Sequence, residues 1–153
     1  MKLRTGEVVI DRKKSHLRSD VLDILPEALV RIEGGAEFIV AEVDFGRIVG
    51  DSLCVLTQTG DEIVYARRLN RIGFTRFVKN RQAEPCSMVT VILKWDDPGE
   101  CYVVITAFVG HRAEPEPWDF NATANSRAFW DSHALIWGSN PTISDTETTA
   151  CPW

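Results

Sequence analysis

Residues 87–110 read SMVTVILKWDDPGECYVVITAFVG and hold the clearest secondary-structure signal in the chain. Two runs of strand-forming residues, 88–95 and 101–109, flank an Asp-Asp-Pro-Gly sequence at 96–99. Proline presets one turn torsion and glycine tolerates positive φ, so this pattern predicts a β-hairpin. Both arms are apolar on nearly both faces, which is typical of strands in the middle of a sheet. We therefore expect the hairpin to form the centre of an antiparallel sheet.

The residues before the hairpin predict a helical region followed by strands. Between residues 15 and 32 apolar side chains recur at helical spacing (Leu17, Val21, Ile24, Leu25, Ala28, Leu29 and Ile32). Pro26 interrupts this stripe, so we expect a kink or two short helices. The strand-like segments that follow are residues 37–45, 62–68 and 74–79, and a short first strand is expected at 7–10.

The residues after the hairpin predict a loop, a short helix and a tail. Residues 111–119 contain two prolines, which exclude regular structure there. A capping residue at 125 or 126 can start a helix that runs to about Trp137. The tail, residues 139–153, is rich in Ser and Thr, and Trp153 could pack it against its own domain or a partner.

These patterns together predict one globular domain over residues 1–153 with an α+β fold. Its expected order is an N-terminal helical region, then a four- to six-stranded mostly antiparallel sheet, then a short C-terminal helix. No apolar run approaches the roughly 18 residues that span a membrane, and the first residues lack the features of a signal peptide. We therefore expect a cytoplasmic protein with no membrane association.

The four cysteines, Cys54, Cys86, Cys101 and Cys151, show no CxxC spacing. This spacing argues against zinc and predicts free thiols, although a disulfide between spatial neighbours stays open. We expect no metal and no cofactor.

The charge distribution singles out a basic segment, residues 67–81. It holds six basic residues and no acidic one (Arg67, Arg68, Arg71, Arg76, Lys79 and Arg81). Because the chain has a formal net charge of −5, these six cations leave −11 on the remainder. A concentrated basic segment can bind an anionic ligand such as RNA even in an acidic protein. It can equally pair with the acidic remainder or form a solvated face.

Common catalytic motifs are absent from the sequence: HExxH, GxSxG, a Walker loop and GxGxxG do not occur. A basic, hydroxyl-bearing sheet with a histidine remains, and this combination suits phosphodiester cleavage. Cations would stabilise the phosphorane, and histidine would act as general acid or base near neutral pH. Because the ribose 2′-OH supplies the nucleophile, such cleavage needs no metal. The catalytic candidates are His133, His111, Thr106, Arg76 and Lys79, and the binding candidates are Arg67, Arg68, Arg71 and Arg81.

Each catalytic candidate also has a structural interpretation. His133 can be a packed helix residue, and His111 can be an exposed loop residue. Thr106 lies within an apolar strand, where threonine often serves as a hydrogen-bonded core residue. Arg76 and Lys79 lie on opposite faces of an ideal strand, so only a bulge or a strand end would let them meet one ligand.

Four sequence pieces resemble a widespread, uncharacterised bacterial family: GFTRFVKNR at 73–81, ITAFVG at 105–110, EPWD at 116–119 and FWDSHAL at 129–135. The order of elements also resembles the ribonuclease toxin group that includes barnase, EndoU, colicin nucleases and RelE. That resemblance implies RNA cleavage at a sheet, with Arg76, Lys79, Thr106 and His133 or His111 as the site. The chain departs from the group in its charge, since those toxins are usually strongly basic.

Three functions follow as alternatives. The first is a metal-independent endoribonuclease of toxin type, which requires its candidate side chains to converge on one open face. The second is a non-enzymatic binding protein that uses residues 67–81 or the C-terminal aromatic loops to hold RNA, a cognate protein or a second copy of itself. The third is a small-molecule enzyme with its site under residues 114–119 and Glu116 or Asp119 as acid or base.

Overall fold

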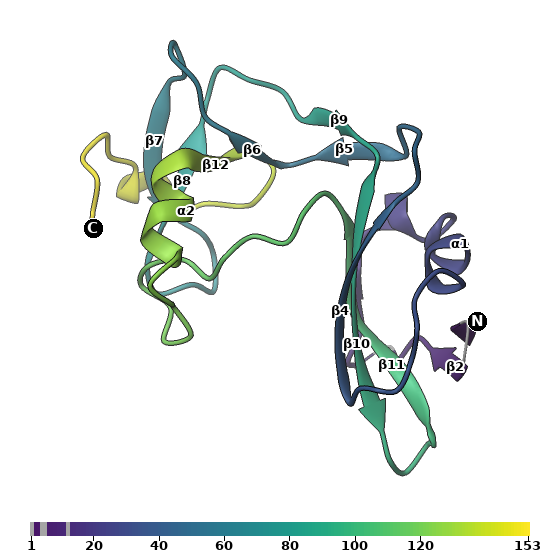
Figure 1. The fold of residues 1–153 in the computed structure, drawn as a ribbon. Coiled ribbons are helices and arrows are strands. Elements are labelled where there is room, and N and C mark those ends of the chain that lie inside the picture. Colours follow the sequence, from purple (N-terminus) through teal and green to yellow (C-terminus); the bar gives the residue numbers. More distant parts are fainter. Residues whose placement is uncertain (1, 4–5, 12) are drawn as a thin grey trace. The chain divides into compact units, whose positions relative to one another are not determined.

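The chain crosses three times between two structural units in the computed structural model, which describes residues 2–3, 6–11 and 13–153 (Figure 1). Unit 1 is built from residues 1–51 and 85–112, and unit 2 from residues 52–84 and 113–153. Each unit therefore combines two segments that are distant in sequence. Two short strands that contain the first two crossings, β5 (Gly50–Ser52) and β9 (Glu84–Cys86), pair with each other.

The predicted hairpin forms the centre of the sheet of unit 1. Strands β10 (Met88–Asp96) and β11 (Cys101–Val109) pair antiparallel, and the sheet order is β1-β2-β11-β10-β4. The sheet ends at β1 (Lys2–Leu3) and β4 (Phe38–Asp44), and β2 (Gly6–Val9) lies between β1 and β11. Strand β3 (His16–Leu17) also pairs with β11. In the turn, Glu100 rather than Gly99 adopts positive φ, at 51°.

The predicted helical region of unit 1 is wrong in extent. It contains only a 3-10 turn, η1 (Ser19–Val21), and a five-residue helix, α1 (Leu25–Leu29). Pro26 lies in the first turn of α1, where its missing N–H is tolerated, so it starts this helix instead of kinking a longer one. The apolar stripe is nevertheless used, because Val21, Leu25, Ala28, Leu29 and Ile32 are all buried in the core of unit 1.

Unit 2 contains a four-stranded sheet in the order β6-β12-β8-β7. These strands are β6 (Cys54–Leu56), β7 (Ile63–Arg67), β8 (Phe74–Val78) and β12 (His133–Ile136). Pairing of β12 with β8 is parallel, and the other two pairings are antiparallel. Helix α2 (Ser126–Ser132) precedes β12 directly. The predicted helix to Trp137 therefore ends five residues early, and its last residues form a strand.

The two faces of this sheet carry different side chains, because successive residues of a strand point to opposite sides. Leu135 is in register with Phe77, and these two residues pack in one apolar cluster with Val64, Ala66 and Trp137. Ile136 is in register with Val78, and these two pack in a second cluster with Val55, Ala134, Ile63 and Ala83. We call the first the pocket face and the second the back face.

The tail runs along the edge strand β7 and contains a 3-10 turn, η2 (Ser144–Thr146). Tyr65 and Thr148 exchange two backbone hydrogen bonds of 2.7 and 2.8 Å. The Trp153 ring packs edge-on against the Tyr65 ring at a centroid distance of 5.3 Å, and its indole N–H donates to Asp131 Oδ1. The tail thus covers backbone groups that an edge strand would otherwise expose.

The predicted α+β class is contradicted, because the chain is 38% strand and 12% helical and is mostly β. The short C-terminal helix is present as α2, but the long N-terminal helical region is not seen. The apolar residues at helical spacing are buried against the sheet, as predicted, but a 3-10 turn and a five-residue helix suffice to bury them. The spacing therefore did not require a long helix.

Candidate functional site

Two of the five catalytic candidates, Thr106 and His111, belong to unit 1. The Thr106 hydroxyl donates to the backbone oxygen of His16 at 2.9 Å, which ties β11 to β3. The side chain of His111 is 66% exposed, and its Nδ1 lies 3.4 Å from Glu42 Oε2. Each residue therefore has a local partner within unit 1.

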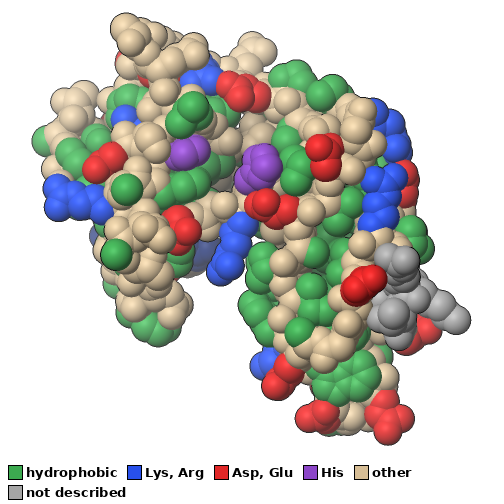
Figure 2. All heavy atoms as spheres, viewed as in Figure 1, with side chains coloured by type: hydrophobic (Ala, Val, Ile, Leu, Met, Phe, Trp, Pro, Cys, Tyr) green, Lys and Arg blue, Asp and Glu red, His purple; other side chains and the backbone are tan. Residues whose placement is uncertain are grey.

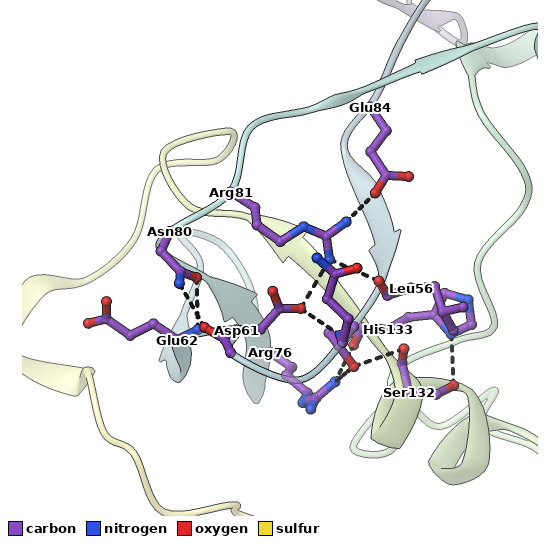
Figure 3. Close-up of polar contacts among 12 residues, drawn as sticks. Leu56, Asp61, Glu62, Arg76, Asn80, Arg81, Glu84, Ser132 and His133 are labelled. Carbon is purple, nitrogen blue, oxygen red and sulfur yellow. Dashed lines mark hydrogen bonds and ion pairs between the residues drawn. The ribbon is translucent and has the colours of Figure 1, made fainter.

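His133 begins β12 in unit 2, where its half-buried ring stacks on Phe129 with centroids 3.9 Å apart. Its Nδ1 lies 2.9 Å from the Phe129 carbonyl oxygen. The same nitrogen lies 3.0 Å from Ser132 Oγ (Figure 3). A carbonyl oxygen only accepts, so Nδ1 carries the hydrogen in the contact with Phe129. Nε2 has no hydrogen-bond partner within the described part of the chain.

Arg76 lies near His133 but does not approach its ring. Its Nη1 donates to the backbone oxygen of His133 at 3.0 Å and to Thr57 Oγ1 at 3.2 Å (Figure 3). By strand alternation from the paired residues of β8 and β12, Arg76 belongs to the back face and His133 to the pocket face. The guanidinium therefore holds the main chain of β12, and these two candidates do not converge on one ligand.

Three of the remaining cations of residues 67–81 are held by carboxylates of unit 2. Arg81 bridges Asp61, at 3.0 Å, and Glu84 (Figure 3). Lys79 pairs with Glu147, and its Nζ lies 4.8 Å from the centroid of the Trp137 ring. Arg68 pairs with Glu116 at 2.7 Å. Acidic and basic side chains are interspersed on the visible face in Figure 2.

Arg67 and Arg71 remain without an ion pair within the described ranges. Arg67 Nη2 donates to the Arg71 backbone oxygen at 3.1 Å, and Arg71 Nη1 donates to the Asn70 backbone oxygen at 3.2 Å. Arg71 is exposed, so most of its N–H donors face solvent. Arg67 is half-buried and its Nε is buried without a partner, so Arg71 is the cation of the basic segment that is most open to a ligand.

A buried polar network connects Arg68, Thr75 and Glu116 on the pocket face. Glu116 is 6% exposed and Thr75 is fully buried. The Thr75 hydroxyl donates to Glu116 Oε1, while Arg68 donates through Nε to Thr75 at 2.9 Å and through Nη2 to Glu116 Oε2 at 2.7 Å. Both carboxylate oxygens are thus engaged, and the loop that carries Glu116 is fastened to β8 and to the residue that follows β7.

Trp118 of the same loop packs on Gly73. A Cβ atom at Gly73 would lie 2.0 Å from Trp118 Cγ, so only glycine allows the indole to lie this close. The indole N–H of Trp118 is buried without a hydrogen-bond partner. This contact and the Glu116 network together fix both ends of residues 116–118.

A pocket of about 320 Å³ lies beneath this loop. Its walls combine charged, aromatic and aliphatic side chains (Arg68, Arg71, Ala113, Glu114, Pro115, Glu116, Trp118, Asp119, Trp130 and Leu135). The predicted basic segment and the predicted aromatic loops therefore meet at one place in unit 2.

Cys54 lies in β6 on the pocket face. Burial, and to a smaller extent the charge of Glu116, raises the pKa of its thiol to about 12. A thiol with such a pKa is protonated at neutral pH and is a poor nucleophile. The four cysteines are free thiols.

The sequence pointed to Glu116 and Asp119 as one alternative, but it did not reveal Thr75 or Gly73 as parts of this site. Thr75 could have been recognised, because it is a polar residue on the same side of its strand as the apolar Phe77. Gly73 had only the signal of a glycine before a strand, which is common in loops.

Comparison with known proteins adds no identification. No protein-family model matches the sequence, and searches of curated proteins and of solved structures gave no significant match. Within the described ranges, no helix has the length and apolar character needed to cross a membrane.

Proposed function

We propose that unit 2 binds single-stranded RNA where the basic segment meets the aromatic loop. The observation that carries this proposal is a pocket whose lining includes both Trp118 and Arg71, an exposed cation without an ion pair within the described residues. Single-stranded nucleic acids are bound by cations that contact phosphates and by aromatic rings on which bases stack. Arg67 donates through Nη2 to the Arg71 backbone oxygen and so helps to hold the segment that carries Arg71.

The internal pairing of Arg68, Lys79 and Arg81 bears on the expected strength of binding. With these three cations held by carboxylates, only a few phosphate contacts are available, so we expect weak, salt-sensitive binding. Base stacking, worth about 1–3 kcal/mol per base, would then supply much of the affinity.

Fluorescence anisotropy with a labelled single-stranded RNA oligonucleotide tests this proposal. Arg71→Gln should weaken binding several-fold and reduce the slope of affinity against salt concentration by about one phosphate contact. Arg47→Gln is the matched control, because Arg47 is an exposed arginine of unit 1 that pairs with Glu27 at 2.7 Å. Equal effects of the two substitutions, or no binding by the wild type, would refute the proposal.

RNA cleavage is a second and weaker candidate, because Thr106 and His111 belong to unit 1 and Arg76 lies on the back face, which leaves His133 as its general base. Its Nε2 has no hydrogen-bond partner within the described residues, and the residue shares the pocket face with Leu135, which lines the pocket. Cleavage without added metal should leave 2′,3′-cyclic phosphate ends and should disappear in a folded His133→Gln variant. If the wild type binds RNA but leaves it intact, the cleavage proposal fails and the binding proposal stands.

A further inference from the structure

We infer that the pocket beneath residues 113–119 receives one unstacked nucleobase and prefers bases that carry an exocyclic amino group. This inference rests on the RNA binding proposed above and specifies what its pocket recognises. A volume of about 320 Å³ lies at the lower end of the range for small-molecule sites, which suits one nucleotide rather than a longer segment.

The apolar walls provide a platform that is already in place. Trp118 is pinned on Gly73, and the indole N–H of the buried Trp130 donates to the Glu114 backbone oxygen at 2.9 Å. Leu135 projects from β12 into the same pocket. Because these side chains are held before a ligand arrives, a base that stacks on Trp118 would require little further ordering.

The three carboxylates of the pocket differ in how many of their oxygens already have a hydrogen-bond or ion-pair partner. Glu116 is neutralised by Arg68, as described above. Asp119 accepts through Oδ1 from the backbone N–H of Asn121 at 2.9 Å, which leaves its second oxygen available. The half-buried carboxylate of Glu114 has no hydrogen bond or ion pair within the described ranges.

Carboxylates accept hydrogen bonds and do not donate them. Free oxygens on Glu114 and Asp119 therefore favour a ligand edge that presents N–H groups, and they repel phosphate. A nucleotide would enter with its base first and leave its phosphate near the exposed guanidinium of Arg71. Adenine, guanine and cytosine carry an exocyclic amino group, whereas uracil has one ring N–H between two carbonyl oxygens.

Cytidine and uridine monophosphates are the matched probes. Cytosine carries an amino group at the ring position where uracil carries a carbonyl oxygen. Titrations followed by ¹H–¹⁵N spectra of the tryptophan indole groups report on the pocket directly, and Trp118→Phe identifies its resonance. We expect cytidine monophosphate to shift the Trp118 signal and to bind about tenfold more tightly than uridine monophosphate. Asp119→Asn combined with Glu114→Gln should reduce this difference, because an amide also offers donors.

The outcomes separate this inference from the proposed function. Equal binding of the two nucleotides would overturn the base preference. An unshifted Trp118 signal, together with normal binding of the RNA oligonucleotide, would overturn the pocket inference and leave RNA binding intact. A cytidine preference without oligonucleotide binding would support the pocket as a nucleotide site and refute RNA binding.

Discussion

Removing the negative charge of Glu116 tests the account of how the loop of residues 116–118 is held. Glu116→Gln keeps the shape of the side chain and an oxygen that can accept from the Thr75 hydroxyl. It removes the charge opposite the Arg68 guanidinium, whose side chain is only 19% exposed. The guanidinium would then be largely desolvated without its carboxylate.

The expected cost follows from this burial. Breaking a buried ion pair by removing one partner costs about 3–5 kcal/mol, and a hydrogen bond to a charged group contributes about 1.5–3 kcal/mol. Because Arg68 keeps some contact with water and the amide keeps an acceptor, we expect Glu116→Gln to lower the free energy of unfolding by about 2–3 kcal/mol. Arg68→Met should lower the free energy of unfolding by less in the Glu116→Gln background than in the wild type, because the ion pair is already lost there.

Urea unfolding followed by tryptophan emission measures this change. Four of the five tryptophans (Trp118, Trp130, Trp137 and Trp153) belong to unit 2, so the signal reports mainly on that unit. Glu27→Gln is the control, because Glu27 makes exposed ion pairs in unit 1, and we expect a small effect. The reasoning is refuted if Glu116→Gln costs no more than this control, or if Arg68→Met is equally costly in both backgrounds.

Three further predictions concern Gly73, the cysteines and Glu42. Gly73→Ala should displace the Trp118 indole and destabilise unit 2 by about 1–3 kcal/mol, and a changed near-UV circular dichroism spectrum would report the displacement. Native protein at pH 8 should react with iodoacetamide at the exposed Cys151 but not at Cys54, whose pKa burial raises to about 12, as peptide mapping would show. A backbone hydrogen bond to the carboxylate lowers the pKa of Glu42, so its contribution to stability is present above the unfolded value of 4.5 and is lost as pH falls. Melting temperatures between pH 6 and 3 should therefore fall less steeply for Glu42→Gln than for the wild type.

The strands were predictable where the local sequence pattern favours the same extended conformation as the strand pairing in the folded chain. In residues 88–109 the turn residues and the apolar runs point to the same hairpin, and the structure confirms it. Strands β4, β7 and β8 also lie within the segments 37–45, 62–68 and 74–79 that the sequence predicts as strands.

The helices were less predictable because burial alone does not set backbone conformation. Residues 16–17 pair with β11, and this pairing overrides the helical spacing of the apolar side chains around them. Residues 133–136 lie between β6 and β8, so they become a strand although the sequence continues a helical pattern. Both changes depend on partners that are distant in sequence.

The sequence predicted which segments carry the residues of the candidate site, but not how those residues are arranged in space. The basic segment and the loop with Glu116 were both recognised, yet their ion pair joins residues 48 positions apart. The proposed Arg76 and His133 pair failed to converge because strand alternation depends on the register of β12 with β8, which the sequence does not reveal.

The interleaved connectivity of the two units has a consequence for synthesis on the ribosome. Unit 1 is complete once residue 112 has been made, whereas strands β6, β7 and β8 of unit 2 are made earlier and must wait for β12 and the tail. During that interval β8 lacks its parallel neighbour and β7 lacks the segment that covers its edge. Non-local strands of this kind pair slowly and are open to wrong partners in the meantime. Unit 2 is thus the part of the nascent chain with the greater need for a chaperone, and neither unit can be produced by shortening the gene from one end.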